Sequence, residues 1–134
     1  MNPKRGGFRL LTEAEWEYVA RGGMETRYSF GSSASLLAQY GWFLDNSAKW
    51  SHRTRQLRPS VAGVFDIHGN SWEWVDDWYE EGSLRTICGG GFGNAAADCR
   101  SAIRFGFAPS DRRGEGFRVA VSPSGIPQSP EADK

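Results

Sequence analysis

Apolar residues in the first part of the chain recur at the spacing of one helical face, which predicts a single short helix. The residues on this face are Leu11, Trp16, Val19 and Ala20. The helix is expected to begin after Thr12, because Thr12-Glu13-Ala14-Glu15 forms a capping box in which the Thr12 hydroxyl and the Glu15 carboxylate each accept a backbone amide. Gly22 and Gly23 are expected to end it after about two and a half turns.

The rest of the pattern is that of short strands between long loops. Strand-like runs, separated by glycine and proline signals, lie at 72–78, 86–92, 100–105 and 116–121. Residues 24–62 lack alternating apolar runs and are expected to be an ordered loop, with a short helical turn at 35–40 and buried aromatic rings. These rings are Tyr28, Phe30, Trp42 and Trp50. The pattern predicts a loop-rich α+β domain over residues 1–121, followed by a disordered tail or linker at 122–134 that is rich in Pro, Ser and charge.

Composition narrows the classes of partner. Sixteen basic and sixteen acidic side chains leave no net charge, so binding to nucleic acid or to an anionic membrane would need a local patch. Arg53, Arg55 and Arg58 cluster, but such a group is more typical of a solvated loop, and we expect no nucleic-acid or membrane partner. The N-terminal sequence has no apolar region that could serve as a secretion signal, which favours a cytoplasmic location.

The chain has two cysteines, Cys88 and Cys99, on either side of a glycine-rich turn. A disulfide across this turn is geometrically conceivable. One pair without a signal peptide gives little support for an oxidising compartment, so the sequence favours two free thiols and leaves the bridge open.

The most informative stretch runs from Gly63 to Trp78 and places three tryptophans among oxygen-bearing side chains around a Gly-Asn turn. The oxygen-bearing residues are Asp66, Asn70, Glu73, Asp76 and Asp77. Carboxylate, amide and carbonyl oxygens are the ligands of hard cations such as Ca²⁺. The stretch therefore indicates a candidate cation loop beside an aromatic wall.

Four ordered segments resemble the sulfatase-modifying-factor family, which is that of the formylglycine-generating-enzyme domain. They lie at 8–23, at 63–74, at 89–92 with 100–104, and at 116–119. The resemblance implies a C-type-lectin-like fold. It begins in the middle of the family domain, which implies that this chain corresponds to its C-terminal part. An edge and an apolar surface would then be open to a partner, such as the missing half or a fused domain.

The resemblance also implies a calcium site. Asp66, Gly69, Ser71 and Glu73 match the family's ligand positions, with side-chain oxygens at the first and last and backbone carbonyls between. The alternative is that Asp66 and Glu73 bind turn amides or pair with an arginine, without an ion. The candidate arginines are Arg100, Arg104 and Arg118.

The family's oxidase chemistry fits the sequence less well. The resemblance implies that an enzyme making formylglycine from a sulfatase cysteine needs two nearby cysteines after the glycine pair, which bind copper(I). Here only Cys99 follows Gly89-Gly90-Gly91, and Cys88 lies before it. One thiolate cannot supply two-coordinate copper. Copper and catalysis are therefore not expected, and a degenerate oxidase is the alternative function.

Between Gly82 and Gly114 the chain contains no Lys, Glu, Gln, Met or Trp, although these residues occur throughout the rest. Some relatives of this fold are variable proteins of diversity-generating retroelements, in which this C-terminal stretch is randomised, and other family modules are fused to bacterial signalling proteins such as kinases. We therefore expect a non-catalytic module that binds a protein or a small ligand through a surface at 92–113. The candidate contact residues are Phe92, Asn94, Asp98, Phe105, Phe107, Arg112 and Arg113.

Overall fold

The computed structural model describes residues 7–111 and 113–122 and has the expected loop-rich α+β character. Its strands are β1 (Phe8–Leu10), β2 (Glu73–Glu80), β3 (Leu84–Cys88), β4 (Arg104–Phe107), β5 (Gly116–Phe117) and β6 (Val119–Val121). Its helical elements are α1 (Glu13–Arg21) and two 3₁₀ turns, η1 (Ala34–Gln39) and η2 (Ala96–Cys99). The expected tail lies outside the described residues except for Ser122, so the domain boundary at 121 stays a prediction.

The helix forms as its sequence predicts. The amide of Glu15 donates to the Thr12 hydroxyl at 3.2 Å, and the amide of Thr12 donates to the Glu15 carboxylate at 2.9 Å. Gly22 ends α1 in the left-handed conformation, with φ of 56°. Trp16 and Ala20 are buried, so the predicted apolar face is the one that packs on the rest of the molecule.

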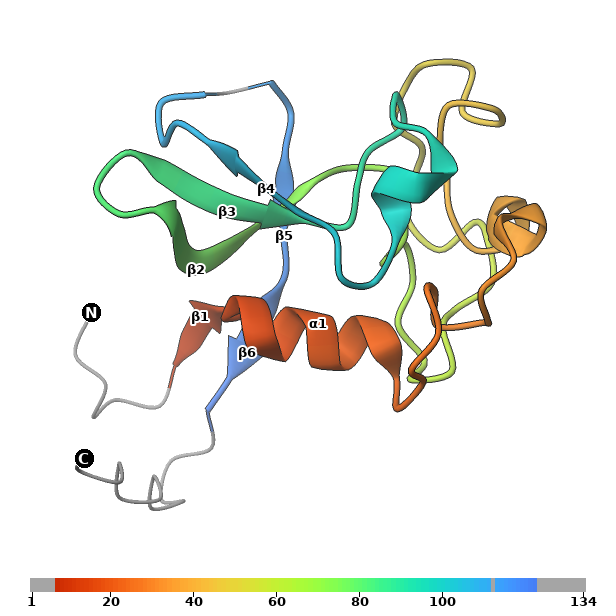
Figure 1. The fold of residues 1–134 in the computed structure, drawn as a ribbon, viewed down its shortest axis with the longest axis horizontal. Coiled ribbons are helices and arrows are strands. Elements are labelled where there is room, and N and C mark those ends of the chain that lie inside the picture. The colour runs from red at the N-terminus through yellow and green to blue at the C-terminus, as the bar shows by residue number, and fades with distance from the viewer. Residues whose placement is uncertain (1–6, 112, 123–134) are drawn as a thin grey trace.

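Two separate sheets lie beside this helix. Four strands pair in the order β4-β3-β2-β5, with β2–β3 and β3–β4 antiparallel and β2–β5 parallel. The second sheet has only β1 and β6, which pair antiparallel. Figure 1 shows the β2–β4 hairpins on one side of α1, β1 and β6 at its N-terminal end, and the long loops with η2 at the other end.

Three strand predictions differ from the structure. The run at 86–92 ends at Cys88, because Gly89 and Gly90 adopt φ of 94° and 75°, which a continuing strand does not allow. The run at 100–105 forms as β4 at 104–107 instead, after the η2 turn. The run at 116–121 is divided at Arg118 into β5 and β6, which belong to different sheets.

The core consists of two clusters. The first contains Leu11, Trp16, Ala20, Ile67, Val75 and Cys88, and the second contains Tyr28, Leu37, Phe43 and Cys99. Tyr28 is buried, Phe30 packs against the second cluster and Trp42 stacks on His52 with ring centroids 3.8 Å apart. Trp50 is 64% exposed, so its predicted burial was wrong. Both thiols are free and each belongs to a different cluster.

Candidate functional site

The Gly-Asn turn before β2 is held in shape by close backbone approaches. Asp66, Gly69 and Asn70 all have positive φ, at 57°, 88° and 66°. A side chain at Gly69 would collide with the carbonyl of Trp42, so only glycine fits there. The Asn70 amide group accepts from the amide of His52 at 2.8 Å and donates to the His52 carbonyl at 3.1 Å, which fixes the turn against the long loop.

Asp66 is buried, and its two carboxylate oxygens have different environments. Oδ2 accepts from the amide of Arg55 at 2.9 Å. Oδ1 is buried and has no hydrogen-bond partner among the described residues. A buried carboxylate oxygen without a partner costs free energy, so a ligand that binds it would stabilise this conformation.

Glu73 is also buried and is held by two donors. Its Oε2 accepts from the indole Nε1 of Trp16 at 2.8 Å and from Nε of Arg118 at 2.7 Å. Burial is the largest influence on this carboxyl group and raises its pKa, in spite of Arg118 and Trp16, which act in the opposite direction. Arg118 also donates to the carbonyl of Phe65 at 2.7 Å, which links β5 and β6 to the turn.

A cavity of about 500 Å³ brings most of the predicted calcium ligands together. Asp66, Ser71 and Glu73 line it, as do Arg55 and Arg118, and Gly69 lies in the same turn. Among the described residues no group of three or more His, Cys, Asp or Glu side chains could hold a metal. A cation here would therefore combine two carboxylates with backbone carbonyls, and the free Oδ1 of Asp66 suits that arrangement. The alternative contacts, a turn amide on Asp66 and Arg118 on Glu73, are also present.

The burial of both thiols disfavours nucleophilic reaction and metal binding. Burial raises the pKa of Cys88 to about 12 and that of Cys99 to about 12. Both side chains are buried in separate apolar clusters. A thiol in such surroundings is neither a ready nucleophile nor an accessible soft-metal ligand.

An aromatic surface is formed by rings from β4, from the C-terminal part of β2 and from the residue directly before β2. Phe105 is 55% exposed, and its ring centroid lies 6.4 Å from that of Trp72, 6.3 Å from that of Tyr79 and 5.9 Å from that of Phe107. We call these four residues the aromatic surface. The guanidinium of Arg104 lies 5.7 Å from the Tyr79 ring and that of Arg113 lies 6.0 Å from the Phe107 ring. Sequence reasoning identified Phe105 and Phe107 but missed Tyr79, which follows the tryptophan-rich stretch.

The other candidate contact residues differ in how exposed they are and in what they contact. Phe92 and Asp98 are partly buried, and Asp98 lies in η2. The side-chain oxygen of Asn94 accepts from the indole of Trp72 at 2.9 Å and from the amide of Gly91 at 3.0 Å. Asn94 therefore holds the Trp72 ring of the aromatic surface in position. Arg113 is exposed and pairs with Asp111 at 3.2 Å. Arg112 lies outside the described residues.

Two further side chains make structural contacts. The Nδ1 of His68 lies 2.8 Å from the carbonyl of Cys99, and its Nε2 lies 3.1 Å from the amide of Ser29. Arg104 pairs with Glu13 at 2.9 Å. Within the described part of the chain, no helix is long and apolar enough to cross a membrane.

Known proteins resemble this chain over between half and nearly all of its length. The formylglycine-generating enzyme of Streptomyces coelicolor is 33% identical over 139 residues, which cover 92% of this chain and 43% of that protein. The serine/threonine-protein kinase pkn1 of Chlamydia pneumoniae is 36% identical over 74 residues, which cover 54% of this chain and 11% of the kinase.

The fold is also similar to that of proteins whose structures have been solved. Treponema denticola variable protein 1 superposes with a TM-score of 0.87 at 32% identity, covering 92% of this chain and 50% of that one. PvdO from Pseudomonas aeruginosa superposes with a TM-score of 0.76 at 31% identity, covering 85% and 52%. The chain thus spans about half the length of these two structures. The model of the sulfatase-modifying factor enzyme 1-like domain matches residues 3–123, and the chain therefore belongs to this family.

Proposed function

We propose that this chain is a non-catalytic binding module that recognises a protein or small ligand through the segment 92–113. The observation that carries the proposal is the aromatic surface, in which Phe105 of β4 and Tyr79 of β2 are exposed on the same sheet beside Arg104 and Arg113. Exposed aromatic rings flanked by arginines are typical of recognition surfaces, because they give large contact area at a small entropic cost.

The arrangement of thiols favours binding over oxidation. A formylglycine-generating oxidase is the alternative, because the proteins similar to this chain include such enzymes. Copper(I) would need two accessible thiolates close together. Here Cys88 and Cys99 are buried in different clusters, and burial raises the pKa of both thiols to about 12.

Calcium is proposed as a structural ion at Asp66 and Glu73, with the carbonyls of Gly69 and Ser71. The partnerless Oδ1 of Asp66 supports this, because a bound cation would satisfy that oxygen. The ion would stiffen the turn that begins β2, and the Trp72 ring of the aromatic surface lies directly before that strand.

The similar proteins suggest two settings for such a module. One is a variable protein like that of Treponema denticola, in which the segment 92–113 would differ between copies on a constant, C-type-lectin-like scaffold. The other is the C-terminal module of a bacterial signalling protein such as a kinase. The aromatic surface would be the contact region in both.

The binding proposal is tested by panning a display library of random peptides on the purified chain. We expect enriched peptides that lose binding to the double variant Phe105→Ser, Phe107→Ser, while melting changes little because both rings lie on the edge strand β4 and neither is fully buried. Val61→Ser, an exposed apolar position in the long loop, is the matched control. Failure to enrich any peptide, or equal binding to the double variant, would refute the proposal that the aromatic surface is the binding site.

The proposal that the chain has no oxidase activity is tested separately. The chain is incubated with copper(I), oxygen and a sulfatase-type Cys-x-Pro-x-Arg peptide, and the peptide mass is followed. We expect no change. Oxidation of the peptide cysteine that depends on Cys99 would favour the oxidase instead.

A further inference from the structure

The long loop between η1 and β2 carries an excess of positive charge. Residues 46–65, which we call the basic loop, contain Lys49, Arg53, Arg55 and Arg58 and no Asp or Glu. Because the whole chain is neutral, the remaining residues carry a net charge of −4. All four basic residues are exposed. Figure 1 shows the yellow part of the chain, which includes this loop, at the end of the molecule away from β1 and β6.

The basic side chains of this loop form no ion pair with a carboxylate within the described residues, in contrast to most arginines elsewhere. Six arginines outside the loop pair with Asp or Glu, at distances of 2.7–3.6 Å. They are Arg9, Arg21, Arg85, Arg104, Arg113 and Arg118. Cations that no internal carboxylate neutralises remain available to the carboxylates of a partner.

An exposed tryptophan lies among these cations. Trp50 follows Lys49 directly in the chain, and its side chain is 64% exposed. Tryptophan and arginine are two of the three residue types most enriched among those that dominate the binding energy of protein interfaces. The basic loop therefore combines a large apolar contact area with charge, which is the composition of a protein-binding site.

The backbone of the basic loop is held in one conformation by the rest of the molecule. The amide of Arg55 donates to Oδ2 of Asp66 at 2.9 Å, and the amide of Arg58 donates to the carbonyl of Gln39 at 2.8 Å. Lys49 and Arg55 both have φ of 65°, a conformation that non-glycine residues keep only where their surroundings hold it. A loop that is ordered before binding loses less conformational entropy when a partner binds.

We propose that the basic loop is a docking site for an acidic segment of another protein, with Trp50 as the apolar anchor. Lys49, Arg53 and Arg58 would pair with carboxylates of that segment. A nucleic acid or an anionic membrane presents negative charge over a wider area and would also meet the net negative remainder of the chain. A short acidic segment confines its charge to the loop. This inference goes beyond the proposed function, because the aromatic surface lies on β2 and β4 and at the residue before β2.

The test measures the binding of a fluorescein-labelled peptide, made of glutamates around one central leucine, by fluorescence anisotropy. We expect saturable binding that weakens as salt is added, and no binding of the peptide in which glutamine replaces glutamate. Arg53→Glu should weaken binding about fivefold or more, because it replaces an attraction by a repulsion. Trp50→Ser should weaken it by about fivefold, as the loss of an interface anchor does.

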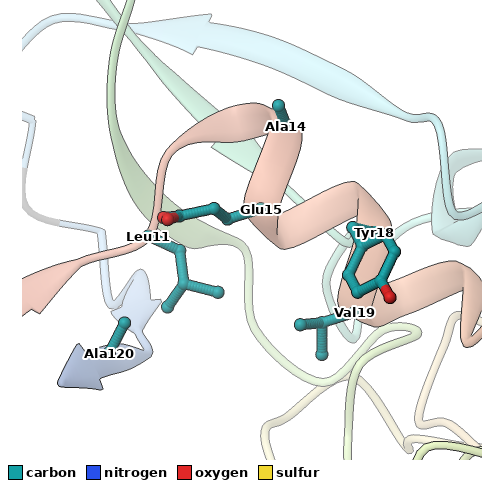
Figure 2. A pocket seen from close by; sticks show the side chains of 6 residues that line it. All are labelled: Leu11, Ala14, Glu15, Tyr18, Val19 and Ala120. Carbon is teal, nitrogen blue, oxygen red and sulfur yellow. The ribbon is translucent and has the colours of Figure 1, made fainter. Parts of the chain in front are cut away.

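Each variant has a matched control. Arg53→Lys keeps the charge at the same position. Arg27→Glu makes the same change in net charge at an exposed arginine outside the basic loop. Tyr18→Ser removes a ring of α1 that is 78% exposed and that lies beside a groove also lined by Leu11 and Ala120 (Figure 2). All three controls should bind the acidic peptide as the unchanged chain does.

Three results would overturn the proposal. One is the absence of binding to the acidic peptide by a chain that circular dichroism shows to be folded. Another is equal weakening by Arg53→Glu and Arg27→Glu, which would assign the binding to net charge alone. The third is tighter binding, at the same salt concentration, to single-stranded oligothymidylate or to vesicles of phosphatidylserine and phosphatidylcholine, which would assign the basic loop to a nucleic acid or a membrane.

Discussion

The buried carboxylate of Glu73 offers a test that separates a scaffold role from a calcium role. Glu73→Ala removes the acceptor for the Trp16 indole and leaves the Arg118 guanidinium without its partner. Glu73→Gln keeps a side-chain oxygen that can accept both donors at 2.7–2.8 Å but removes the negative charge. The two substitutions therefore differ in hydrogen bonding and agree in charge.

The expected magnitudes follow from this geometry. Removing one partner of a buried ion pair costs about 3 to 5 kcal/mol. For a domain of this size that corresponds to a fall in melting temperature of roughly 10–15 °C for Glu73→Ala. Glu73→Gln replaces charge-assisted hydrogen bonds by weaker ones and should cost about 1 to 2 kcal/mol.

The assay is thermal unfolding of both variants in calcium and in chelator, with Glu80→Gln at the exposed end of β2 as the control. If calcium binds only the folded chain, the ion raises the melting temperature of the unchanged protein and of the control in a concentration-dependent way. It should have no effect on either Glu73 variant. A calcium response that survives in Glu73→Gln would refute the ligand role, and a loss below 1 kcal/mol for Glu73→Ala would refute the buried pair.

Three other predictions concern the scaffold. Thr12→Ala removes half of the capping box of α1 and should lower the free energy of unfolding by about 1 kcal/mol, measured by urea titration. Burial lowers the pKa of His68 from 6.5 to about 4. As the pH falls from 6.5 to 4, the unfolded chain therefore takes up a proton before the folded chain does, and the free energy of unfolding should fall. A His68→Gln variant whose free energy of unfolding has the same pH slope would contradict this. Cys88 and Cys99 should react with iodoacetamide at pH 8 only on unfolding, and rapid labelling of the native chain would show that they are not buried.

Local chemistry made part of this structure predictable from sequence. The capping box and the Gly22 end of α1 depend on residues within one or two turns, and they form as the sequence indicates. The Gly-Asn turn before β2 is equally local, because Asp66 and Asn70 tolerate positive φ and Gly69 permits the close approach of Trp42. The burial of Trp16 and Ala20 follows from helical periodicity.

Long-range pairing was decided only by the tertiary structure. No local pattern indicates that Trp16 and Arg118 meet at one oxygen of Glu73, or that Arg104 reaches Glu13 rather than Asp76. The end of β3 depends on the conformations of Gly89 and Gly90, which the sequence permits without requiring. Trp50 was expected to be buried, yet it is exposed, because burial depends on which surfaces the fold brings together.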